Sequence, residues 1–94
     1  MGAIVEGRDH IRSTREEDRL VEGAVLQQVL AIHPNPVTVA ELVDEIAGKG
    51  CDFVQRDAVE RAVRGLAGCG LLHLIEALVL PSRAALRFDE LLGE

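Results

Sequence analysis

The sequence predicts a mainly α-helical domain with a small β-hairpin. Apolar residues recur at the helical spacing of 3.6 in four segments, with Pro or Gly between them. Two short apolar runs, residues 71–75 and 78–80, lack that spacing and resemble neighbouring strands. Aromatic residues make up 2% of the chain although 48% is hydrophobic, so the core must consist of Leu, Val, Ile and Ala. This composition favours helices over sheets.

The chain has 94 residues, which is enough for one domain. We expect a flexible N-terminal arm over residues 1–12, where no helical period is sustained, and a domain over residues 13–94. No apolar run is long enough to cross a membrane, and the first residues lack a signal-peptide core. We therefore expect a cytoplasmic protein without membrane contact, with Cys51 and Cys69 as reduced thiols.

The first helix is expected to start at Ser13 or Thr14, because each hydroxyl precedes a glutamate at capping-box spacing. It should end before Pro34 and Pro36. Its apolar stripe is wider than one core face requires, which suggests contact with a partner subunit.

A second, short helix is predicted after Thr38, with Glu41 completing a capping box and residues 48–50 ending the helix. A third helix is predicted over residues 52–68. The helical period places its apolar residues on one side and its charged residues on the other. The apolar set is Val59, Ala62, Val63 and Leu66; the charged set is Arg56, Asp57, Glu60, Arg61 and Arg64.

Gly68 and Gly70 follow the third helix and predict its end. The hairpin over residues 71–80 should turn at Glu76-Ala77. Ser82 is then expected to cap a last helix.

This order of elements resembles the winged helix-turn-helix domain of bacterial transcription regulators over residues 16–92. The matching stretches are 38–42 at the start of the second helix, 57–66 in the third, and 70–72 before the hairpin. The resemblance implies that helix 52–68 is a recognition helix in the major groove of duplex DNA and that hairpin 71–80 is the wing. Gln55, Arg56, Glu60 and Arg61 would then face bases, and Arg64 a phosphate.

The charge distribution departs from that family's usual pattern. The wing tip is Glu76-Ala77, the exposed residues of the second helix are acidic, and the net charge of the chain is −6. Few phosphates would therefore be neutralised on binding. The alternative function is a winged-helix protein-interaction or dimerisation module that does not bind DNA.

The apolar residues of the first and last helices have two interpretations. They either fill the core of the monomer or form a two-fold interface, and we favour a homodimer. The candidate interface residues are Val21, Val25, Leu26, Leu30, Leu86, Phe88, Leu91 and Leu92.

Catalysis is not expected, because the nucleophile-elbow, phosphate-loop and zinc-protease motifs are missing. A metal site at Cys51, Cys69 and His73 is disfavoured, because the spacing lacks a CxxC pair and crosses a change from helix to strand. We expect no cofactor.

Overall fold

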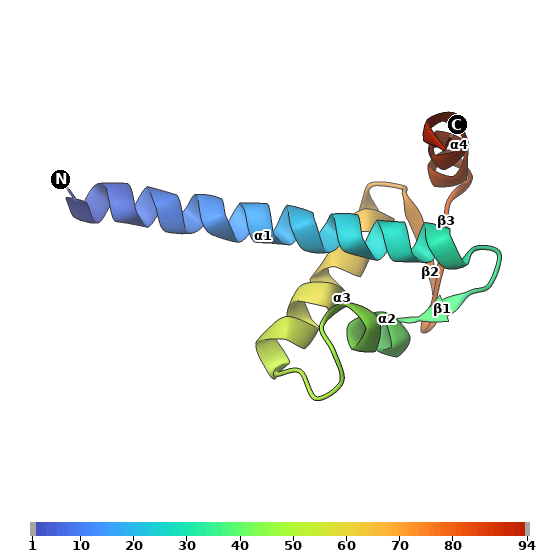
Figure 1. Ribbon diagram of the computed structural model, residues 1–94, viewed down its shortest axis with the longest axis horizontal. Coiled ribbons are helices and arrows are strands. Elements are labelled where there is room, and N and C mark those ends of the chain that lie inside the picture. Colours follow the sequence, from blue (N-terminus) through green and yellow to red (C-terminus); the bar gives the residue numbers. More distant parts are fainter. Residues whose placement is uncertain (1, 94) are drawn as a thin grey trace.

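The computed structural model describes the backbone of residues 2–93 and the side chains of residues 15–93. It is mainly helical, with one small antiparallel sheet (Figure 1). The elements are α1 (Gly2–Ile32), β1 (Val37–Thr38), α2 (Val39–Ile46), α3 (Phe53–Gly68), β2 (Leu72–Ile75), β3 (Leu78–Pro81) and α4 (Arg83–Leu92). The predicted flexible arm, residues 1–12, lies outside the residues whose side chains are described, and its flexibility stays a prediction.

Helix α1 begins at Gly2 rather than at Ser13 or Thr14, where we predicted its start. No proline occurs before Pro34, so nothing in the sequence forces a break in the backbone hydrogen-bond ladder. The helix ends at Ile32, just before the predicted stop at Pro34. The prediction was therefore right about the end of this helix and wrong about its beginning.

The other helices have the boundaries that their capping residues specify. Thr38 and Glu41 form the predicted capping box of α2, and the Ser82 hydroxyl accepts a hydrogen bond from the Ala85 amide at the start of α4. At the end of α3, Gly70 has a φ of 90°, which favours glycine. The Gly70 and Leu71 amides donate to the carbonyls of Ala67 and Leu66, which is the Schellman arrangement.

The sheet has three strands in the order β1-β3-β2, where we predicted a two-stranded hairpin. The predicted hairpin is present, with His73 opposite Leu80 and Ile75 opposite Leu78. The additional strand β1 pairs Val37 with Val79 and Thr38 with Leu78. This strand was missed because two residues are too few to show an alternating pattern.

One apolar core lies between α1, α2, α3 and the sheet. Helix α3 packs mainly on α1 and also contacts α2 and β2. Figure 1 shows α2 and α4 on opposite sides of α1. The predicted apolar face of α3 is buried, as is the sheet residue Val79. The core consists of Val25, Val29, Val37, Leu42, Val43, Val59, Ala62, Val63, Leu66, Leu72 and Val79.

Candidate interaction surfaces

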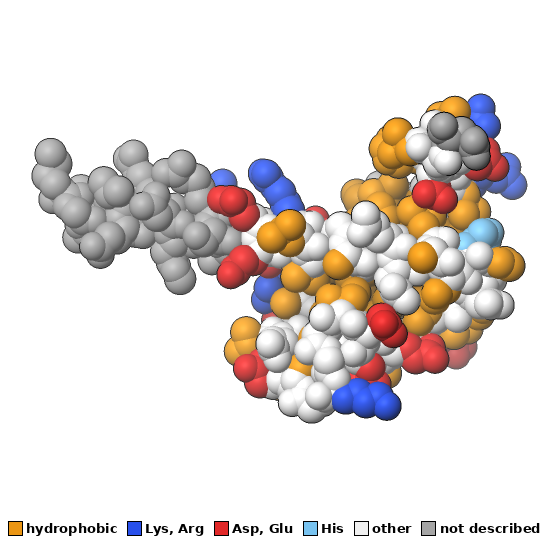
Figure 2. Space-filling view, in the orientation of Figure 1, with side chains coloured by type: hydrophobic (Ala, Val, Ile, Leu, Met, Phe, Trp, Pro, Cys, Tyr) orange, Lys and Arg blue, Asp and Glu red, His pale blue; other side chains and the backbone are white. Residues whose placement is uncertain are grey.

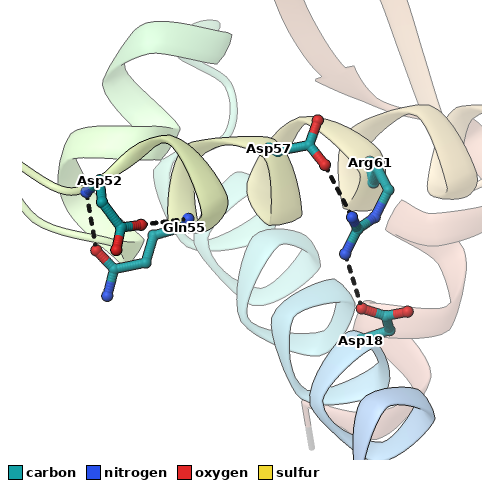
Figure 3. Close-up of polar contacts among 5 residues, drawn as sticks. All are labelled: Asp18, Asp52, Gln55, Asp57 and Arg61. Carbon is teal, nitrogen blue, oxygen red and sulfur yellow. Dashed lines mark hydrogen bonds and ion pairs between the residues drawn. The ribbon is translucent and has the colours of Figure 1, made fainter. Parts of the chain in front are cut away.

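The first turn of α3 is held by a capping box that the sequence analysis did not identify. The Asp52 carboxylate accepts a hydrogen bond from the Gln55 amide at 2.8 Å, and the Gln55 side chain accepts one from the Asp52 amide at 3.1 Å (Figure 3). Two backbone donors at the helix start are thereby satisfied. Gln55, predicted to face a base, is exposed but has its side-chain oxygen engaged in this local contact.

Arg61 is held between two carboxylates. Its guanidinium donates to Asp57 at 2.8 Å, one turn earlier on α3, and to Asp18 of α1 at 3.2 Å (Figure 3). The Arg61 side chain remains 51% exposed, so water and salt screen both pairs. The guanidinium is nonetheless directed toward α1 and its charge is balanced, which makes it a poor phosphate contact.

The other predicted contact residues of α3 are available to a partner. Arg56 and Arg64 are exposed, and neither side chain forms a hydrogen bond or ion pair with any residue from 15 to 93. Glu60 is half-buried and lines a shallow groove between α2 and α3 together with Arg56 and Asp44. The positive charge available on the exposed face of α3 is therefore that of Arg56 and Arg64, which lie near carboxylates.

The tip of the hairpin is acidic and its strands expose apolar side chains. Glu76 takes a left-handed backbone conformation with a φ of 58°, so the tight turn is made without glycine. Leu74, Ile75 and Leu78 are among the exposed large hydrophobic residues. No Lys or Arg occurs between Arg64 and Arg83. The hairpin therefore has no Lys or Arg with which to bind phosphate electrostatically.

Both aromatic residues of the chain are on its surface. Phe53, in the first turn of α3, is 81% exposed and Phe88 of α4 is 56% exposed, while Tyr and Trp are absent from the sequence. Val54 is exposed beside Phe53. The sequence analysis proposed no role for Phe53 or Val54, although the helical period already places them outside the apolar stripe of α3.

The predicted dimer residues divide into three groups by burial. Val25 is fully buried in the core, and Val21 and Leu26 pack against that core, so the apolar width of α1 is largely used within the monomer. Leu30 and Leu86 are half-buried. Phe88, Leu91 and Leu92 remain exposed on α4, where Figure 2 shows hydrophobic side chains gathered. Val25 therefore belongs to the core, and the predicted interface residues that remain exposed all lie on α4.

The described residues contain no group of three or more His, Cys, Asp and Glu side chains placed to hold a metal ion. Cys51 and Cys69 are both free thiols, and Cys69 donates to the Leu66 carbonyl at 3.4 Å. Within residues 2–93, no helix combines the length and apolar character needed to cross a membrane.

Comparisons with known proteins provide no relative from which a role could be transferred: no family model, no curated protein and no solved structure matches this chain. The functional argument therefore depends on the surface itself.

Proposed function

We propose that this chain is a protein-interaction module with a winged-helix fold. The observation that carries the proposal is the exposure of Phe53 and Phe88, the only aromatic side chains in the sequence. Burying a phenylalanine contributes about 1.5–3 kcal/mol. Aromatic residues are also enriched in the central, desolvated part of protein interfaces. A chain with two such residues that leaves both in water has its strongest contact residues available for another protein.

The arrangement of the elements supports the winged-helix part of the proposal. Three helices, a hairpin and a last helix follow one another in the order that the resemblance implies, with the short strand β1 added before α2. The wing would be β2 and β3, whose exposed residues are Leu74, Ile75 and Leu78 around an acidic tip. Such a wing fits an apolar protein surface better than a phosphate backbone.

DNA binding is the second candidate, and Arg56 and Arg64 favour it. Both are exposed on α3, the helix that would enter the major groove, and neither is paired with a side chain between residues 15 and 93. Against it stand the neutralised Arg61, the exposed carboxylates of α2 and a net charge of −6. Each carboxylate near the groove reduces the electrostatic free energy of binding.

The two functions are separated by titrating the protein into labelled duplex DNA at about 50 mM salt, where electrostatic affinity is high. The variant is Arg56→Ala with Arg64→Ala, and the matched control is Arg87→Ala on α4. For an interaction module we expect no difference between wild type and either variant, and no salt-dependent binding. Binding that weakens with salt, disappears in the α3 variant and persists in the control would overturn the proposal in favour of DNA recognition.

A further inference from the structure

A groove between α1, α2 and β1 has an apolar floor and an acidic rim. Ile32, Val37 and Leu42 are among the apolar residues that line this α1–α2 groove, which has a volume of about 270 Å³. Its polar lining consists of the carboxylates of Glu41 and Glu45 and of two amide side chains, and among the described residues it includes no Lys or Arg. The groove therefore offers an apolar contact edged by negative charge.

The Glu41 carboxylate is held in place at this rim by the capping box of α2. Its Oε1 atom accepts hydrogen bonds from the Thr38 amide at 2.8 Å and from the Thr38 hydroxyl at 3.1 Å. Its Oε2 atom has no partner among residues 15–93. Glu45 follows one turn later on α2, is exposed, and forms no ion pair in that range. A charge that the fold already orders loses little side-chain entropy when a partner binds it.

The negative charge extends across α2. Every charged residue of this helix is acidic, and the third of them, Asp44, lines the groove between α2 and α3. Figure 2 shows acidic side chains gathered over the region that Figure 1 labels α2. Lys49, the next basic residue along the chain, lines neither groove. The three carboxylates of α2 therefore repel one another without a counter-ion from residues 15–93.

The charge and the size of the α1–α2 groove narrow the choice of occupant. A second copy of this chain has a net charge of −6, and DNA carries a negative charge at every phosphate, so the acidic rim repels both. Small-molecule sites have volumes of ~300–1,000 Å³, and this open groove is smaller. A side chain of a larger, positively charged partner fits both observations.

We propose that the α1–α2 groove docks a basic amphipathic segment of another protein. An apolar side chain of that segment fills the groove, and Lys or Arg residues beside it pair with Glu41 and Glu45. This inference rests on the proposed interaction function and names the chemistry of the partner.

The test is fluorescence anisotropy of a labelled peptide of leucine and lysine with a helical period, titrated with the full chain at low salt. The peptide should bind, and added salt should weaken binding. Glu41→Gln with Glu45→Gln should raise the dissociation constant about three- to tenfold. Glutamine also forms capping boxes, so this variant should fold, as circular dichroism checks. The matched control is Glu16→Gln with Glu17→Gln, which changes the net charge equally at two exposed glutamates of α1 and should leave binding unchanged.

Two further peptides separate docking from general electrostatic attraction. A peptide of serine and lysine lacks the apolar side chain, and a peptide of leucine and glutamate reverses the charge. Both should bind about tenfold more weakly or less. If the serine peptide binds as tightly as the leucine peptide, or if the α1 control weakens binding as much as the α2 variant, the groove is not the docking site and the inference is overturned.

The remaining outcomes distinguish this inference from the function on which it rests. A leucine–lysine peptide that does not bind overturns the basic partner. Binding that is kept in the α2 variant and lost with Phe53→Ser places the peptide on α3, which overturns the groove and leaves the interaction function standing. Salt-sensitive DNA binding through Arg56 and Arg64, measured in the separate titration with duplex DNA, overturns the interaction function itself.

Discussion

Helices α3 and α4 are built from the same kind of sequence and have opposite environments. Each begins at a capping side chain, Asp52 in α3 and Ser82 in α4, and each carries apolar residues at helical spacing beside mixed charges. The apolar face of α3 is buried between α1 and α2, whereas most of the apolar face of α4 is exposed. Amphipathicity therefore identifies a face that needs covering without identifying what covers it.

The charges of the two helices differ in the same way. On α3, Arg61 forms an ion pair across to Asp18 of α1, so its charge ties two elements together. On α4, Arg87 pairs with Glu90 of the same helix and with no other residue from 15 to 93. Helix α3 is thus connected to the body by both its apolar and its charged residues, while α4 is attached through its connection to β3, the buried Ala85 and a small contact with α1. We interpret α3 as a structural centre and α4 as a contact helix.

The largest effect should come from matched truncations of one leucine on each helix. Leu66→Ala in α3 removes a buried side chain and leaves a cavity, so it should lower the unfolding free energy by about 2–5 kcal/mol at any protein concentration. Leu92→Ala in α4 should cost less than about 0.5 kcal/mol where the chain is monomeric. Urea denaturation at two protein concentrations measures both.

Self-association through α4 would sharpen this comparison, because association stabilises the folded state by mass action. The cost of Leu92→Ala would then grow with protein concentration, while that of Leu66→Ala would not. Equal, concentration-independent losses at both positions would show that α4 is as well packed in solution as α3.

The capping residues should give the next largest effect. Asp52→Ala removes the acceptor for the Gln55 amide and should lower the unfolding free energy by about 1 kcal/mol. Ser82→Ala removes the acceptor for the Ala85 amide, and we expect a local effect, with faster hydrogen exchange confined to the α4 amides. Exchange measured by mass spectrometry distinguishes the two. Faster exchange throughout the core in Ser82→Ala would mean that α4 unfolds together with α3.

The sequence predicted what depends on local chemistry. The capping box of Thr38 with Glu41, the buried stripe of α3 and the hairpin were each predicted from residues close together in the chain, and all three are confirmed. The predicted start of α1 was wrong. Ser13 and Thr14 are suitable capping residues, but the helix continues through them toward the N-terminus. Strand β1 was missed, because its pairing with β3 is a long-range contact.

The sequence predicted which residues belong to the candidate surfaces, but it did not predict which of their side chains are free to contact a partner. The arginines of α3 were identified from the sequence. The ion pair of Arg61 with Asp18, however, depends on how α1 crosses α3, and spacing along the chain does not reveal that crossing. Likewise, Val25 and Leu91 are both apolar residues at helical spacing, and only the packing shows that one is core and the other is surface.

The smallest effects should come from the two ion-paired arginines. They test whether the charged residues of α3 contribute more to stability than those of α4. Arg61→Gln should cost up to about 1 kcal/mol, because it removes a bridge between two helices. Arg87→Gln should cost less than about 0.5 kcal/mol, because its pair lies within one helix. Both losses should shrink at high salt, which screens exposed pairs. Urea denaturation at low and high salt is the measurement.

A double-mutant cycle of Arg61→Gln with Asp18→Asn isolates the bridge, and a coupling of about zero would contradict it. The same Asp18→Asn variant also links the structural and functional arguments, because it leaves the α3 arginine balanced only by Asp57. If α3 were a DNA-reading helix restrained by its own carboxylates, adding Asp57→Asn should release Arg61 and strengthen salt-dependent DNA binding. An interaction module predicts instead that freeing this arginine changes stability and leaves DNA binding absent.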